Sequence, residues 1–161
     1  MNSEVAARVT AFLDAHHVMS LATGGPQGVH AVNLFYARHI YASHGFSLLW
    51  LSDPKTRHSA AIEADPKVSA TIAPDYRDFN EIRGLQISAY AHRVTEDAER
   101  RRARDLLEAR YAFLKALADH PSLNRASENA VLYRLVPRTI VMIDNTRGFG
   151  HKDTLEFESS N

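Results

Sequence analysis

Residues 17–36, HVMSLATGGPQGVHAVNLFY, contain two β-type runs separated by a turn sequence. The central GGPQG, at 24–28, combines glycine and proline, the residues that most strongly mark turns. Strand-like runs at 17–23 and 29–37, joined by so short a segment, predict a β-hairpin. A hairpin pairs its two strands antiparallel, so this stretch predicts that the sheet begins with antiparallel pairing.

Further β-rich runs follow along the chain. A pair of strands is predicted over 39–51, with a turn near Ser43 to Gly45, and single strands over 67–73, 82–94 and 130–144. Pro137 interrupts the last run, and proline cannot donate to a β-ladder, so it predicts a bulge or a break there.

Three segments predict helices. Apolar residues recur at helical spacing over 3–15. A short helix is predicted from Asp53 to about residue 64, because aspartate is a good N-cap and the proline that follows suits the first turn. The segment 96–110 places acids before bases, as the helix dipole favours, with Thr95 as its predicted N-cap.

About six or seven strands with mostly hairpin connections, plus three or four helices, predict a mainly β (α+β) fold. The expected architecture is an antiparallel barrel or curved sheet with peripheral helices. The glycine-rich motifs of dinucleotide-binding and P-loop proteins do not occur, which argues against those enzyme classes. The length of 161 residues and the lack of a linker predict a single domain over 1–161.

Composition narrows the functional classes. Nineteen basic and nineteen acidic residues balance, so no global charge favours nucleic acid or an anionic membrane, and an anion site must be a local cluster. The absence of cysteine excludes disulfides, iron–sulfur clusters and thiolate catalysis. Neither a signal peptide nor an apolar run of the ~20 residues that span a membrane is evident, so we expect a cytoplasmic protein.

The most informative local cluster lies at the start of the short helix, where Lys55, Thr56, Arg57 and His58 follow Ser52. Cations are disfavoured at a helix N-terminus, which already carries partial positive charge. A bound phosphate would resolve that conflict by accepting hydrogen bonds from backbone, hydroxyl and basic groups together. The alternative is a solvated helix start with no ligand.

The same cluster carries a resemblance to a known family. Residues 56–58, then 62–66 (IEADP) and KVSATI, resemble the phosphate-binding segment of the pyridoxamine phosphate oxidase-like FMN-binding split β-barrels. The hairpin at 17–36 and the segment 84–103 resemble other parts of that family. NTRGFGHK, at 145–152, resembles the tail of a small uncharacterised branch.

This resemblance implies a six- to seven-stranded antiparallel split barrel in which Ser52, Lys55, Thr56, Arg57 and His58 surround the FMN phosphate. His58 stands where the family usually has lysine. The family also implies a homodimer with two FMN molecules at the subunit interface, each touched by both chains, and a small-molecule substrate.

Candidate contacts to the flavin ring follow from the same resemblance. They are Asn33, Phe35, Trp50 and Gln86 on strands, and Arg147, Gly148, Phe149 and His151 in NTRGFGHK. Each has an alternative interpretation: core packing for Asn33, Phe35 and Trp50, an exposed strand position for Gln86, and a polar turn for 145–152. No residue is assigned as a catalytic acid or base.

Two functions remain open from the sequence. The first is an FMN-dependent oxidoreductase acting on an unidentified small molecule. The second is a non-catalytic module that binds haem or another ligand, with His58 or His151 as a candidate iron ligand. The nine histidines show no metal-binding spacing, and we expect no structural metal site.

Overall fold

The computed structural model describes residues 3–41, 45–119 and 129–157, in which eight strands form one antiparallel sheet. The strand order is β2–β1–β5–β6–β7–β4–β3, and β8 also pairs with β7. The strands are β1 (Val18–Thr23), β2 (His30–Phe35), β3 (Ala37–Tyr41), β4 (Gly45–Ser52), β5 (Lys67–Ile72), β6 (Arg83–Arg93), β7 (Val131–Asp144) and β8 (Lys152–Glu156).

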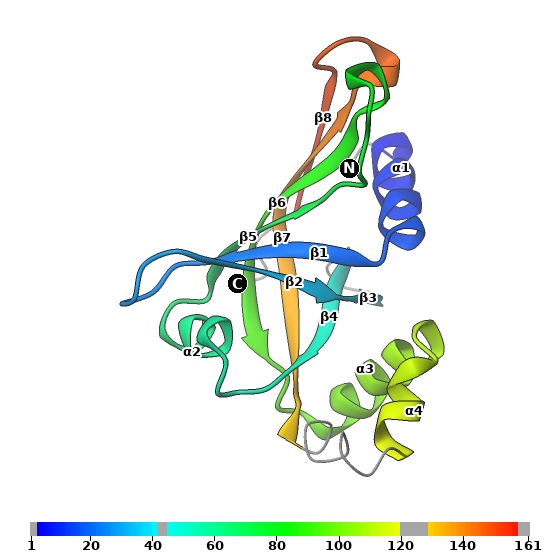
Figure 1. Cartoon of the computed structure of the whole chain (residues 1–161). Helices are drawn as coiled ribbons and strands as arrows, with labels where there is room; N and C mark the ends of the chain where they lie inside the picture. The colour runs from blue at the N-terminus through cyan, green and yellow to red at the C-terminus, as the bar shows by residue number, and fades with distance from the viewer. Residues whose placement is uncertain (1–2, 42–44, 120–128, 158–161) are drawn as a thin grey trace.

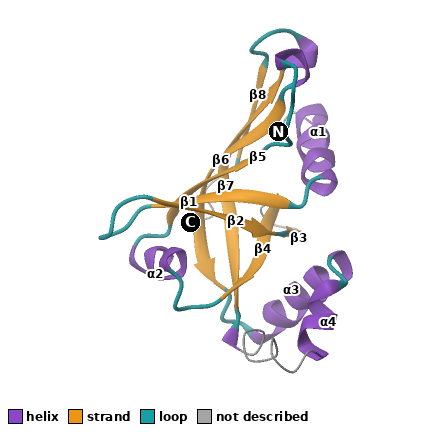
Figure 2. Cartoon of the chain, viewed as in Figure 1, coloured by secondary structure: helices purple, strands orange, loops and turns teal. Residues whose placement is uncertain are grey.

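Helices lie around this sheet, and they are α1 (Ser3–Ala15), α2 (Arg57–Ala64), α3 (Asp97–Arg110), α4 (Phe113–Asp119) and the 3₁₀ turns η1 (Phe79–Glu81) and η2 (Asn145–Arg147). Figure 1 shows β6 and β7 running through most of the molecule, with η2 at one end and α2 and α3 toward the other. Figure 2 shows that the strands curl into a split barrel with the helices outside it. The predicted antiparallel architecture with peripheral helices is confirmed.

Two apolar clusters hold the fold together. The larger one fills the inside of the curled sheet and is closed by α1; its fully buried members include Leu13, Leu21 and Trp50. The smaller one packs α3 onto the outer face of β4 and β7. Residues 46–50 of β4 are therefore all buried, because both faces of that strand are covered.

Three local predictions about the strands are confirmed. β1 and β2 form the predicted hairpin, in register from Val18↔Phe35 to Thr23↔His30. β3 and β4 form the predicted strand pair, although residues 42–44 of its turn lie outside the described residues. Pro137 marks a bulge, since the β6–β7 register shifts there, and β7 continues through it as one strand.

Two predicted helix caps are wrong. α2 begins at Arg57 with Thr56 as its N-cap, because Asp53 is used to close the preceding turn. The Asp53 carboxylate accepts from the backbone N–H of Lys55 at 2.8 Å, and its carbonyl accepts from that of Thr56 at 3.1 Å. For α3 the N-cap is Glu96 instead of Thr95, without a side-chain capping bond.

The sequence did not reveal β8. Its residues, KDTLE, are mostly charged or polar and carry a weak strand signal. Pairing with β7 from Thr139↔Glu156 to Ile143↔Lys152 supplies the missing stabilisation, together with burial of Leu155 and Phe157 in the main core. The segment after residue 151 is thus a strand, and only the part before it is a turn.

None of the helices within the described ranges is long and apolar enough to cross a membrane.

Candidate functional site

Lys55 and Arg57 line a cavity of about 330 Å³ between α2 and the loop that joins β1 to β2. The rest of its lining consists of Gly25, Pro26, Gln27, Gly28, Ala60, Ala61 and Ala64. Alanines on this face of α2 leave the hollow open, and both cations in the lining belong to the predicted cluster. The lining contains no carboxylate, so the charge at this cavity is positive.

The guanidinium of Arg57 is held by the loop. Its Nη2 donates to the Gln27 carbonyl at 2.6 Å and lies 3.4 Å from the Val29 carbonyl. No partner within the described ranges accepts from Nε or Nη1, so these donors stay available to a ligand. The arginine is therefore both a brace for the loop and a candidate anion-binding group.

Glycine brings the loop close to the helix. A Cβ at Gly25 would lie 3.3 Å from the Cβ of Ala61, a tight contact that would push the loop away from α2. The sequence indicates only a turn for GGPQG and does not assign it to the site. Its place beside Lys55 and Arg57 depends on packing between segments about thirty residues apart.

Ser52, Thr56 and His58 do not line this cavity and form a hydrogen-bonded group of their own. The His58 Nε2 is 2.5 Å from the Ser52 hydroxyl and 3.2 Å from that of Thr56. Ser52 and His58 are both buried, and the His30 ring stacks near that of His58. Burial, reinforced by His30, lowers the pKa of His58, which favours the neutral imidazole. These three residues brace the start of α2 and contribute no positive charge to the cavity.

Asn33 and Gln86 lie in one row across the exposed face of the sheet. The register pairs Asn33 with Ser20, Ser20 with Thr71, and Thr71 with Gln86. All four side chains are exposed, and the Ser20 hydroxyl donates to the Asn33 Oδ1 at 2.7 Å. This face therefore offers a line of hydrogen-bonding groups that starts on the strand leading out of the Arg57 loop.

Trp50 and Phe35, the other two strand residues predicted to contact the flavin ring, differ sharply in burial. Trp50 is fully buried inside the barrel, where its ring stacks on Tyr133 at 5.5 Å, so it belongs to the core. Phe35 is 51% exposed and contacts Tyr111 and Phe113, each at 5.2 Å between ring centres.

The segment 145–152 lies at the opposite end of the sheet from α2, as Figure 1 shows. Its backbone is fixed by Asn145, whose side chain accepts from the Gly150 N–H at 3.0 Å and donates to the Phe79 carbonyl at 2.7 Å. Gly148 and Gly150 have φ of 131° and 73°, which other residues rarely adopt. This conformation projects Phe149, which is 84% exposed and touches Phe79.

Ion pairs occupy the charged groups around that turn. Arg8 of α1 reaches Asp144 at 2.8 Å and Asp153 at 2.5 Å, which ties α1 to the end of β7 and to β8. Burial pushes the pKa of Asp144 up, but hydrogen bonds from Thr146 and Arg8 outweigh it and hold this pKa below its usual value. The Nε2 of His151 lies within hydrogen-bonding distance of the Asp153 carboxylate, at 3.0 Å, and Arg147 pairs with Glu4 at 3.3 Å.

The predicted residues thus fall into separate places within one chain. Lys55 and Arg57 meet at the cavity, Asn33 and Gln86 share the exposed face, and the 145–152 turn lies at the opposite end of the sheet from the cavity. Neither candidate iron ligand is exposed and unengaged, since His58 is buried and the His151 ring is hydrogen-bonded to Asp153. Among the described residues, no three histidine or acidic side chains gather in a metal-binding group.

Comparisons with known proteins agree with this fold. The family model of pyridoxamine 5'-phosphate oxidase matches residues 5–144. A UPF0306 protein of Serratia proteamaculans is 29% identical over 145 residues, which cover 90% of each chain.

Two solved structures show the same architecture at low identity. A haem-binding protein from Mycobacterium smegmatis superposes with a TM-score of 0.69 at 19% identity, covering 94% of this chain and 57% of that one. An FAD-binding protein from Mesorhizobium loti gives a TM-score of 0.63 at 19% identity, covering 83% and 90%. With the family model matching most of its length, the chain belongs to the pyridoxamine 5'-phosphate oxidase-like split-barrel family.

Proposed function

We propose that this protein binds FMN as a homodimer and acts as a cytoplasmic flavin-dependent oxidoreductase on a small molecule. The observation that carries the proposal is the cavity where Lys55 and Arg57 converge beside a glycine-rich loop and a helix start. Two cations facing a cavity without a lining carboxylate suit a phosphate group.

The residues present fit FMN at two points. At the cavity, Nε and Nη1 of Arg57 and the ammonium of Lys55 would hold the phosphate in charge-assisted hydrogen bonds. Along the exposed face, Asn33 and Gln86 offer amide groups to the polar edge of a flat ring. When bound, the flavin supplies the hydride or electron transfer, and the chain supplies orientation and exclusion of water.

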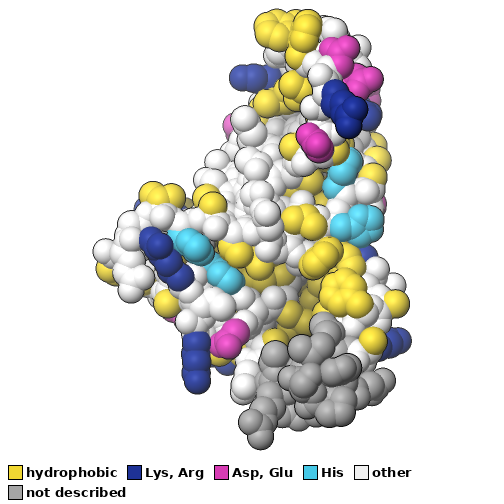
Figure 3. Space-filling model, viewed as in Figure 1, with side chains coloured by type: hydrophobic (Ala, Val, Ile, Leu, Met, Phe, Trp, Pro, Cys, Tyr) yellow, Lys and Arg dark blue, Asp and Glu magenta, His cyan; other side chains and the backbone are white. Residues whose placement is uncertain are grey.

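A second copy of the chain would complete this site. The 145–152 turn cannot reach Arg57 of its own chain, because the two lie at opposite ends of the sheet. If two sheets packed face to face about a two-fold axis, Arg147, Gly148 and Phe149 of one chain would approach the ring bound by the other. Exposed Val18, Phe35 and Phe113 provide apolar surface for such an interface. Figure 3 shows apolar side chains gathered beside α3 and α4.

The dimer is tested by Phe35→Glu. We expect the wild-type protein to sediment near twice 18.0 kDa, and the variant to shift toward the monomer because a charge is buried in the interface. FMN affinity should fall with the loss of the dimer. The control is Ile40→Glu, at another exposed apolar position, which should stay dimeric. A monomeric wild-type protein that still binds FMN tightly would contradict the proposal.

The cofactor is tested by the absorption spectrum of the protein purified from cells. We expect a flavin spectrum, with the bound flavin reduced by NADH or NADPH and reoxidised by an acceptor. A Soret band would instead favour the haem-binding alternative, for which similarity to a haem-binding protein is the support. A colourless protein that takes up neither added cofactor would contradict both.

A further inference from the structure

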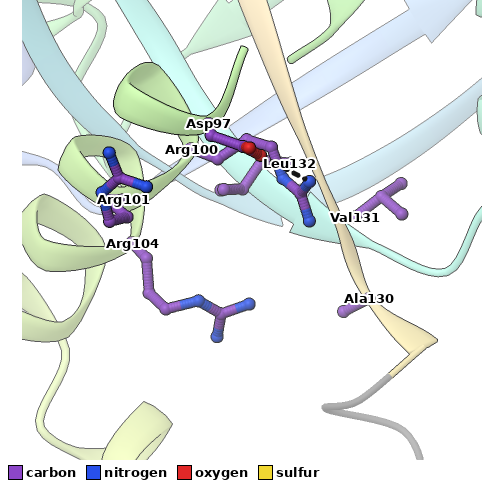
Figure 4. A pocket seen from close by; sticks show the side chains of 7 residues that line it. All are labelled: Asp97, Arg100, Arg101, Arg104, Ala130, Val131 and Leu132. Carbon is purple, nitrogen blue, oxygen red and sulfur yellow. Dashed lines mark hydrogen bonds and ion pairs between the residues drawn. The ribbon is translucent and has the colours of Figure 1, made fainter. Parts of the chain in front are cut away.

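A second group of cations lies on α3, away from the Arg57 cavity. Arg100, Arg101 and Arg104 line a hollow of about 210 Å³ between α3 and the beginning of β7. In Figure 4, Arg104 extends from the helix across this space toward Ala130. The other lining residues are Asp97, Val131 and Leu132.

Helical spacing explains why these arginines share one side of α3. Residues three and four apart lie on the same flank, so Arg104 is the neighbour of both Arg100 and Arg101. Ala103 and Leu107 bury an adjacent flank against the sheet. The three arginines therefore form one cluster on α3 beside the hollow.

The charge of this cluster is only partly compensated. Arg100 pairs with Asp97 at 3.2 Å, but in the part of the chain that the structure describes no carboxylate pairs with Arg101 or Arg104. Like charges three and four residues apart on a helix repel one another. A bound anion would relieve that repulsion, as an anion would at Arg57.

The hollow also continues along the sheet. A second cavity, of about 540 Å³, shares Arg100, Val131 and Leu132 with the first. It extends to Arg93 on β6 and to Glu63 on α2. Together the two cavities form one groove, whose lining includes Arg93, Arg100, Arg101 and Arg104 and the carboxylates of Asp97 and Glu63.

The wall of this groove is held in place. Glu99 of α3 accepts from the Nη1 of Arg134 on β7, at 2.8 Å and 2.9 Å for its two oxygens. Burial pushes the pKa of Glu99 up, but the hydrogen bonds from Tyr41 and Arg134 outweigh it and keep the pKa below its usual value. The ion pair therefore fixes the first turn of α3 against the sheet near neutral pH.

We propose that this groove is a second anion site, which binds a phosphate-bearing small molecule. Arg101 and Arg104 receive the phosphate, since guanidinium groups match its geometry with paired hydrogen bonds. This assignment is independent of FMN, because its residues do not line the cavity at Arg57.

The test is calorimetric titration of the full chain with inorganic pyrophosphate, and with AMP against adenosine. We expect pyrophosphate and AMP to bind and adenosine to bind far more weakly. Arg101→Gln/Arg104→Gln should lower the affinity for pyrophosphate about tenfold or more, as expected for lost charge-assisted hydrogen bonds. Circular dichroism should show an unchanged fold, because both side chains are exposed.

Two control variants distinguish binding in this groove from a general effect of charge and from binding at the Arg57 cavity. Arg102→Gln removes one positive charge from the same helix, outside the groove lining, and should leave the affinity unchanged. Arg57→Ala should also leave this site unchanged. Equal weakening by Arg102→Gln would indicate a general charge effect and overturn the proposal. Loss of binding only in Arg57→Ala, or no binding by the wild-type protein, would overturn it as well.

Discussion

Replacing Arg57 with alanine is expected to weaken FMN binding by roughly ten- to a hundred-fold, because hydrogen bonds to charged groups contribute ~1.5–3 kcal/mol. Riboflavin has the same ring without the phosphate, so its affinity should hardly change. The difference between the two ligands isolates the phosphate contribution. Both affinities can be measured by quenching of flavin fluorescence.

The structure adds a second consequence of this substitution. The Arg57 guanidinium also braces the β1–β2 loop through the Gln27 carbonyl, and alanine removes that brace. Removing a cation from the positive N-terminus of α2 should stabilise the helix and offset the loss of this brace. We therefore expect little net change in the free energy of unfolding of the unliganded protein. Arg57→Lys keeps the positive charge but lacks the forked guanidinium that makes paired hydrogen bonds. Its FMN affinity should therefore lie between those of the wild type and Arg57→Ala.

The matched control is Arg77→Ala, which removes an exposed arginine that does not line the cavity. It should leave both affinities unchanged. If Arg57→Ala weakened FMN and riboflavin equally, the arginine would support the loop or the ring instead of the phosphate. Unchanged affinities for both ligands would remove Arg57 from the site.

Trp50→Ala is expected to lower the free energy of unfolding by about 3–5 kcal/mol, the usual cost of deleting a buried large aromatic side chain. Trp50 is completely buried and stacks on Tyr133 inside the barrel. Denaturant unfolding followed by circular dichroism measures the change. The folded fraction of the variant should keep the FMN affinity of the wild type, because the Trp50 side chain does not lie on the exposed face of the sheet.

Trp50→Phe distinguishes packing from hydrogen bonding at this position. The Trp50 Nε1 has no hydrogen-bond partner among the described residues, and leaving a buried donor unpaired is costly. Phenylalanine keeps an aromatic ring and removes that donor, so it should cost well under half of the alanine effect. Phe79→Ala, at a 57% exposed ring, should change stability by less than ~1 kcal/mol. A selective loss of FMN affinity in Trp50→Phe at unchanged stability would instead indicate that Trp50 contacts the flavin ring.

Local chemistry made much of the fold predictable. Glycine and proline in GGPQG determine a turn through the backbone angles they allow, so the β1–β2 hairpin follows from its own residues. Pro137 likewise predicts its bulge, because a missing N–H breaks the ladder wherever the chain is placed. The predicted cluster at 55–58 also includes Lys55 and Arg57, the two cations that line the cavity.

Other features depend on contacts between distant segments, which local patterns do not contain. β8 is a strand because β7 lies beside it, and Trp50 is in the core because the sheet curls around it. Residues 52–58 form one cluster in the sequence. In the folded chain Ser52 and His58 are buried, whereas Lys55 and Arg57 line the cavity. The sequence alone determined the turns, the periodicity and the residue types of the site. Tertiary packing decided which of those side chains share a space, because the position of a side chain depends on segments that lie far away along the chain.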